Sequence, residues 1–99
     1  MIQILVLLEI KDKSSFKEFE NKAIQIMKKY GGRLLTALEP NKGESSDKSV
    51  GEIHLLEFPD LEAFRNYRAD NDLAELKELR ERAISQTSIY VSEKVVIYE

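Results

Sequence analysis

The sequence predicts an α+β domain with the element order β-α-β-β-α-β. This is the ferredoxin-like arrangement, in which one antiparallel sheet carries its helices on a single face. Segments rich in β-branched and aliphatic residues lie near the start, in the middle and at the end of the chain. Between them are two segments with apolar residues at helical spacing. Proline, glycine and polar clusters separate the segments, as turns and loops require.

The composition is that of a folded domain. The 99 residues are 42% hydrophobic and 33% charged, with a net charge of -3 at pH 7. We therefore expect one domain over residues 1–99. Charges of both signs are interspersed, without the basic stripe that predicts nucleic-acid binding. The chain has no cysteine, which excludes disulfides and thiolate chemistry and suits a cytoplasmic location.

The first predicted strand covers residues 2–10, IQILVLLEI. One face of this strand is wholly apolar, and the other is apolar in the middle and polar at the ends. Such a strand lies centrally in a sheet, with cover on both sides. The apolar run is much shorter than the about 20 residues that cross a bilayer, so we expect no membrane segment here.

The segment that follows has the signature of an amphipathic helix. Ser15 and Glu18 match a capping box, which predicts the helix start. Apolar residues at helical spacing continue from residue 16 to residue 30. The glycine pair at 31–32 supplies the left-handed residue that commonly ends a helix.

Two strands and a loop are expected next. The strands cover residues 33–39 and 50–58, and the polar stretch 41–49 joins them. This connection is longer than the two to five residues usual in hairpins. It is either a lid over a nearby pocket or a tolerated surface insertion.

The second helical region begins at Asp60, a good capping residue. Its apolar stripe is interrupted at 70–72, where Asp72 and Glu75 match a second capping box. A fourth strand is expected over residues 87–91. Residues 95–98 either extend that strand or form a short extra one.

This order of elements leaves one sheet face without helices. Right-handed crossovers place both helical regions on the same side. The other side presents roughly 400 Å² with Leu5 and Leu7 near its middle, which is at the limit of what a monomer exposes. We therefore expect a homodimer in which two sheets pack face to face, a dimeric α+β barrel. Such packing leaves a cavity beside the sheet for a small molecule.

Three segments carry a family resemblance. KYGGRLL (29–35), HLLEFPDLEAFRNY (54–67) and LKELR (76–80) resemble the DUF1330 family of the dimeric α+β barrel superfamily, which also includes cofactor-free monooxygenases. Typical relatives end a strand in Glu-Phe-Pro and then place an aromatic residue and an arginine on the helices. The matching positions here are Glu57, Phe58, Pro59, Tyr67 and Arg80.

The chain departs from the family pattern at one corner. Asp70 and Asn71 stand where relatives commonly have Ser-Pro, and Leu73 stands where tyrosine is common. The family has no agreed activity, so the resemblance implies a fold rather than a reaction.

Five residues are candidates for ligand contacts. His54, the only histidine, shares a strand face with apolar residues and is either an acid–base group or a structural histidine. Glu57 lies on the opposite face and needs a basic partner, either Arg80 or Arg33. That pair is either an anion clamp or a structural ion pair. Tyr67 offers a hydroxyl to a ligand or is core.

Other chemistry receives little support from the sequence. Glu9 is a further candidate, since the pKa of one carboxyl would rise if Glu9 and Glu57 met across neighbouring strands. One histidine without carboxylates at ligand spacing predicts no metal site. There is no phosphate loop or nucleophile elbow, and we expect no cofactor.

Three functions remain open at this point. The favoured one is a homodimeric domain that binds a small molecule. The second is a cofactor-independent enzyme, resembling a monooxygenase or an isomerase, that acts on a small organic substrate. The third is a structural or regulatory dimer without a ligand. An enzyme requires an open cavity containing a titratable group with a shifted pKa, a binding domain requires only the cavity, and a structural dimer requires neither.

Overall fold

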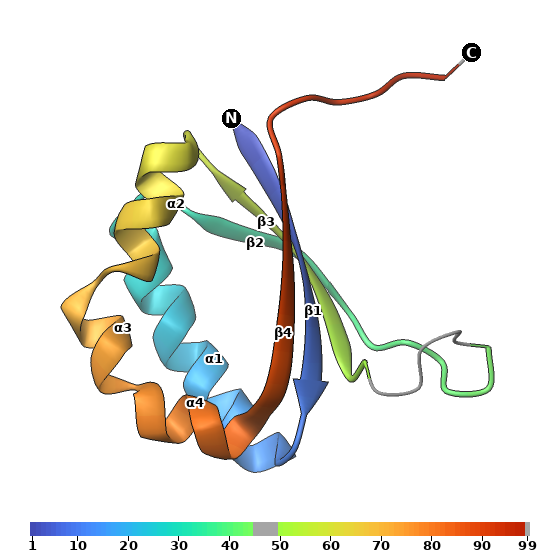
Figure 1. Cartoon of the computed structure of the whole chain (residues 1–99), viewed down its shortest axis with the longest axis vertical. Coiled ribbons are helices and arrows are strands. Elements are labelled where there is room, and N and C mark those ends of the chain that lie inside the picture. Colours follow the sequence, from blue (N-terminus) through green and yellow to red (C-terminus); the bar gives the residue numbers. More distant parts are fainter. Residues whose placement is uncertain (45–49, 99) are drawn as a thin grey trace.

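The computed structural model describes residues 1–44 and 50–98. Its elements follow the predicted order (Figure 1). They are β1 (Ile2–Ile10), α1 (Lys13–Lys28), β2 (Arg33–Leu38), β3 (Glu52–Phe58), α2 (Leu61–Arg68), α3 (Asn71–Glu75), α4 (Lys77–Ala83) and β4 (Ile84–Ser92).

The strands form one antiparallel sheet in the order β2-β3-β1-β4. All four helices lie on one side of it, and no helix of the described chain covers the other side (Figure 1). The ferredoxin-like prediction is therefore confirmed. None of the helices within residues 1–44 and 50–98 has the length and apolar character needed to span a bilayer.

Side-chain alternation along the central strands decides which residues form the core. Ile4 and Phe58 have the largest fully buried side chains of the described residues, and both lie under the helices. α1 contributes its own apolar stripe, which includes Phe16, Phe19 and Met27, to the same core. The odd-numbered residues of β1 point to the uncovered face, where Leu5 is 39% exposed.

The helix starts differ from the predicted ones in two places. α1 begins at Lys13, and its N-cap is Asp12, whose carboxylate accepts a hydrogen bond from the Ser15 backbone N–H at 3.2 Å. α3 is capped by Asp70 rather than Asp72. In both cases an aspartate two or three residues upstream takes the cap, because its carboxylate accepts the unpaired N–H groups of the first turn. The prediction of Asp60 as the cap of α2 is confirmed.

The glycine pair ends α1 for two different reasons. Gly31 adopts a φ of 73°, the left-handed conformation that glycine tolerates best. Gly32 permits a close approach, because a Cβ at this position would lie 2.5 Å from both the Met27 and the Phe58 side chains. This contact lets the end of β3 pack directly beneath the end of α1.

The last segments also differ from expectation. β4 starts at Ile84, directly after α4, whereas the sequence predicted a start at residue 87. Residues 95–98 neither extend β4 nor form a strand of their own. The loop predicted over 41–49, either a lid or a surface insertion, lies partly outside the described residues, since 45–49 are not described.

Candidate functional site

His54 occupies the middle of β3 on the side that faces the helices. Its neighbours across the sheet are Val6 on β1 and Ala37 on β2. The side chain is only 5% exposed, and its Nε2 lies 2.9 Å from Oε1 of Glu52, two residues earlier on the same strand face. Phe16 of α1 packs beside the imidazole, with ring centroids 6.1 Å apart. The imidazole is thus held in place by a carboxylate and an aromatic ring.

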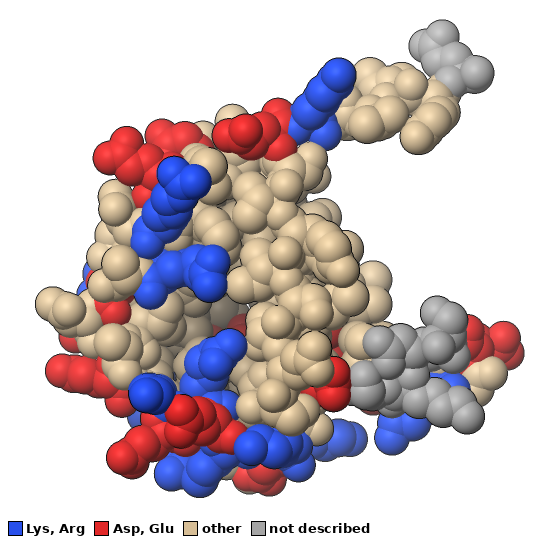
Figure 2. Space-filling view, viewed as in Figure 1, with Lys and Arg blue, Asp and Glu red and all other residues tan. Residues whose placement is uncertain are grey.

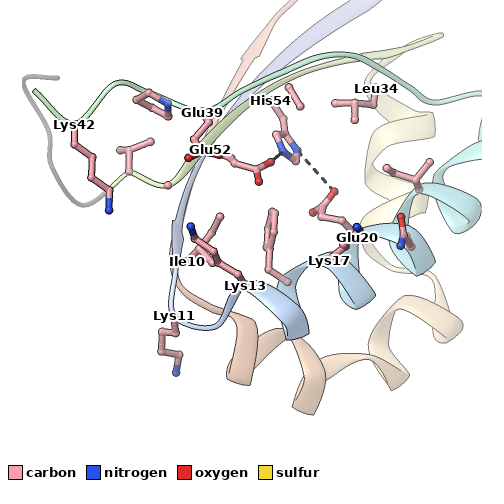
Figure 3. Close-up of a pocket in the computed structure, with 17 residues that line it drawn as sticks. Ile10, Lys11, Lys13, Lys17, Glu20, Leu34, Glu39, Lys42, Glu52 and His54 are labelled. Carbon is pink, nitrogen blue, oxygen red and sulfur yellow. Dashed lines mark hydrogen bonds and ion pairs between the residues drawn. The ribbon is translucent and has the colours of Figure 1, made fainter. Parts of the chain in front are cut away.

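Glu20 reaches His54 from α1. Its Oε2 lies 3.7 Å from His54 Nδ1, on the side of the ring opposite Glu52 (Figure 3). Burial raises the pKa of the Glu20 carboxyl above its ordinary value of 4.5; His54 opposes this rise, and the Glu52 charge adds to it. Glu52, His54 and Glu20 form a row of titratable groups, here called the polar row, from the sheet to the helix layer.

A cavity of about 590 Å³, here called the outer cavity, opens on one side of the polar row. It lies between the first half of α1 and the strands β2 and β3 (Figure 3). Lysines line it, with apolar side chains between them. The lysines are Lys11, Lys13, Lys17 and Lys42.

A second cavity of about 330 Å³, here called the inner cavity, lies between the sheet and the helices. Most of its wall is aliphatic or aromatic. The polar or charged residues that line it are Glu20, His54, Tyr67, Arg68, Arg80 and Thr87. Glu20 and His54 belong to both cavities, so the polar row separates them.

Two arginines line the inner cavity from the helices. Arg80 of α4 donates from Nη2 to the Thr87 hydroxyl at 3.1 Å, which ties the guanidinium to β4. Arg68 of α2 stacks over the Phe64 ring, 5.6 Å from its centroid. Both arginines are exposed, whereas His54 is buried. The inner cavity thus combines an apolar wall with cationic side chains that reach solvent, which suits an organic molecule with an anionic group.

Tyr67 lies against the aromatic cluster of the inner cavity. Its ring centroid is 5.5 Å from that of Phe58 and 6.5 Å from that of Phe64. Burial, with a contribution from the Glu20 charge, raises the pKa of the Tyr67 phenol to about 12. The hydroxyl therefore stays protonated across the physiological range and is available as a hydrogen-bond donor.

The five predicted ligand contacts separate into two groups. His54, Tyr67 and Arg80 line the inner cavity together. Glu57 and Arg33 lie on the uncovered sheet face, where Arg33 Nη2 is 2.5 Å from Glu57 Oε1. Of the two partners considered for Glu57, the structure pairs it with Arg33. Arg80 is on a helix that covers the other face and cannot reach it.

The strand register contradicts a pairing of Glu9 with Glu57. Glu57 is opposite Gln3 on β1, and Glu9 lies at the other end of that strand, opposite Gln86 of β4. The two carboxylates are therefore separated by most of the length of the sheet. Glu57 instead has a basic partner, Arg33.

Sequence reasoning missed Glu20, Glu52 and Arg68. Glu20 carried a usable signal, because it lies four residues after Phe16 and so on the apolar stripe of α1. A carboxylate on the buried face of a helix needs an explanation. Glu52 carried a weaker signal: it is two residues from His54, and residues two apart on a strand share a face.

The polar row does not have the geometry of a metal site. Within residues 1–44 and 50–98, no three His, Asp or Glu side chains are grouped so that they could hold a metal ion. Glu20 and Glu52 approach different nitrogens of the His54 ring. An ion bound to one nitrogen would therefore have only one of these carboxylates beside it.

The pKa direction of Glu20 gives a stability prediction. The folded state raises the pKa of Glu20. Below about pH 4.5 the carboxyl is protonated in both the folded and the unfolded chain, so it does not lower the free energy of unfolding. As the pH rises from there through the folded pKa, the buried carboxylate becomes charged and the free energy of unfolding falls. We expect Glu20→Gln to melt a few degrees higher than the parent chain at pH 7.5, with the difference vanishing at pH 4. Thermal melts at matched protein concentration test this. Glu18→Gln, at an exposed position on α1, is the control, and an equal gain in that variant would contradict the assignment.

The fold recurs in solved structures of low sequence identity. A protein of unknown function from Rhodopseudomonas palustris superposes with a TM-score of 0.80 at 13% identity, covering 97% of this chain and 83% of that one. A dabb family protein with a ferredoxin-like fold from Mesorhizobium loti gives 0.69 at 18% identity, covering 96% and 97%. An antibiotic biosynthesis monooxygenase gives 0.68 at 13% identity, covering 97% and 100%. At these identities the likeness is one of fold alone.

The family comparison is more specific. No curated protein matches the sequence. The family described as "Domain of unknown function (DUF1330)" matches residues 3–94, which is nearly the whole chain. The resemblance seen in the sequence is thereby confirmed, and the chain belongs to the DUF1330 family.

Proposed function

We propose that the chain is a cytoplasmic homodimer that binds a small organic anion in the inner cavity. Arg80 and Arg68 would pair with the anionic group, and the Tyr67 hydroxyl and His54 would contact the rest of the molecule. The single observation that carries this proposal is the convergence of these side chains on one apolar cavity. At about 330 Å³, that cavity is at the small end of the range for ligand pockets.

The uncovered sheet face supports the homodimer. Leu5, Leu38 and Tyr90, from three different strands, are 39%, 56% and 59% exposed on it. Figure 2 shows this face in profile, at the right of the view, where the atoms between the C-terminal segment and the grey residues belong mostly to uncharged residues. An isologous contact with a second copy covers such a face on both partners at once.

A cofactor-independent enzyme is the second candidate, and Glu20 favours it. A buried carboxyl with a raised pKa beside an imidazole is the kind of group that general acid–base catalysis uses. Glu20 and His54 line both cavities, and in such an enzyme they would carry a proton from a bound molecule towards the outer cavity. One neighbour in fold is described as a monooxygenase, which agrees with this alternative without assigning a substrate.

A thermal-shift screen against small aromatic and aliphatic carboxylates tests the binding proposal. A ligand at 100 times its Kd stabilises the fold by about 2.7 kcal/mol, which raises Tm by roughly 10 °C in a domain of this size. We expect aromatic carboxylates to be the best hits, because the cavity wall is largely apolar. Arg80→Met keeps the aliphatic stem of the side chain and should weaken binding at least tenfold.

Arg82→Met is the matched control, because Arg82 lies on the same helix, is exposed, and does not line the inner cavity. It should bind as the parent chain does. Equal binding by Arg80→Met and the parent would contradict the proposed site. A hit whose turnover is lost in Glu20→Gln, while its binding is kept, would favour the enzyme over the binding domain.

A further inference from the structure

The chain beyond β4 leaves the body of the molecule. Residues 93–98, here called the C-terminal arm, run outward from the end of the sheet (Figure 1). Four consecutive apolar residues of the arm, Val95, Val96, Ile97 and Tyr98, are 74%, 62%, 79% and 90% exposed. A run of this kind is costly to leave in water and normally marks a contact with another molecule.

The direction of the arm is set at its base. The Ser92 hydroxyl donates to the Lys94 carbonyl at 2.9 Å, and the Lys94 N–H approaches the same hydroxyl at 3.4 Å. The arm then extends to the side of the sheet that carries no helices (Figure 1). Residues 39–44 project to the same side from the opposite end of the sheet (Figure 1). The uncovered face thus lies between the arm and residues 39–44 (Figure 1).

The uncovered sheet face alone is too small for a stable dimer interface. A face of roughly 400 Å² on each partner gives about 800 Å² in total, whereas stable specific interfaces bury about 1,200–2,000 Å². Four large apolar side chains on each arm add several hundred square ångströms per protomer when covered. Sheet face and arm together therefore reach the size of a stable dimer interface.

The length of the arm shows how far it reaches. Packed sheets lie about 10 Å apart, and six extended residues span about 20 Å. From the edge of one sheet, the arm is long enough to cross the gap and continue along the partner. Its apolar residues are the ones furthest from its base, where they would meet the other protomer.

We propose that residues 95–98 form an exchanged arm that packs on the second protomer of a sheet-to-sheet dimer. This inference rests on the homodimer proposed above. The residue types of the arm also favour a second copy of this chain as its binding partner. Its β-branched and aromatic side chains pack better on an aliphatic sheet face than on a charged surface. The exposed Leu35 and Leu38 of the edge strand β2 offer such a surface on the partner.

Sedimentation velocity over a concentration series tests the contribution of the arm. The double variant Val96→Ser, Ile97→Ser should raise the dimer Kd at least tenfold, while Glu93→Ala, Lys94→Ala, in the same segment, should not. An unchanged Kd in the first variant would overturn the exchanged arm and leave the dimer intact. A parent chain that sediments as a monomer at high micromolar concentration would overturn both.

A mixed dimer distinguishes exchange from packing on the arm's own protomer. Because the chain has no cysteine, a spin label at Tyr98→Cys is unique. Labelled protomers without ¹⁵N are mixed with ¹⁵N protomers, so that any broadening of ¹⁵N signals is intermolecular. We expect broadening in the ¹⁵N protomer's sheet, and none from a label at Gln25→Cys on the helix side. A dimer in which the Tyr98→Cys label broadens nothing would overturn the proposal.

Discussion

Leu5→Lys should convert the proposed dimer into a monomer. Leu5 is in the middle of the uncovered face, with Leu55 opposite it on β3 and Tyr90 opposite it on β4. In an isologous contact the substitution places two lysines at the interface, and each would lose its water without gaining a partner. We expect the dimer Kd to rise at least a hundredfold. In the separated protomer the new side chain faces solvent, so the fold should remain.

Light scattering coupled to size exclusion measures this result at several loading concentrations. Gln25→Lys adds the same charge on the exposed side of α1 and is the control. Circular dichroism of both variants should match that of the parent. A Leu5→Lys chain that still elutes at twice 11.4 kDa would contradict a dimer formed through this face.

Phe58→Ala should cause a large loss of stability. Phe58 is 0% exposed, and its ring contacts Phe64 at 5.2 Å and Tyr67 at 5.5 Å between centroids. Removing a buried phenyl ring costs about 3–5 kcal/mol, because the space is only partly refilled. In a domain of this size such a loss lowers Tm by more than roughly 10 °C. The same ring supports Tyr67, so ligand binding should weaken as well.

Urea unfolding at fixed protein concentration gives the free energy directly. Phe58→Leu retains most of the buried volume and should cost much less, about 1 kcal/mol. If the alanine variant unfolds within about 1 kcal/mol of the parent, then Phe58 does not organise the contact between β3 and α2.

The sequence determined the fold through alternation and periodicity. β1 shows period-two burial, and α1 shows an apolar stripe, so their buried faces followed directly from residue types. The caps were harder to predict. Asp12 and Ser15 are both good capping residues, and only the backbone conformation decides which of them accepts the free N–H groups.

The candidate site was predicted in part, because contacts between elements depend on register. His54, Tyr67 and Arg80 were all named from the sequence, and all three line the inner cavity. The partner of Glu57 was left open, since β2 and β3 meet through an irregular register between Leu34 and Thr36. A β-bulge of this kind has no reliable signature in a single sequence.

Glu20 shows a different limit of sequence reasoning. Its spacing from Phe16 was an unused signal of burial, and nothing in the sequence indicated which residue of the sheet it would contact. Its contact is His54 on β3, 34 residues later in the sequence, which faces α1. The C-terminal arm is the opposite case, since its strand-like residues find no strand partner among the described residues of this chain.

Binding in the inner cavity is tested most directly at the His54 side chain. His54 is the only histidine, so selective labelling gives one set of imidazole signals from the boundary between the two cavities. We predict that an aromatic carboxylate found by thermal shift moves these signals in the parent and in Arg82→Met, and much less in Arg80→Met. A ligand that stabilises the protein while leaving the His54 signals unchanged would contradict binding in the inner cavity.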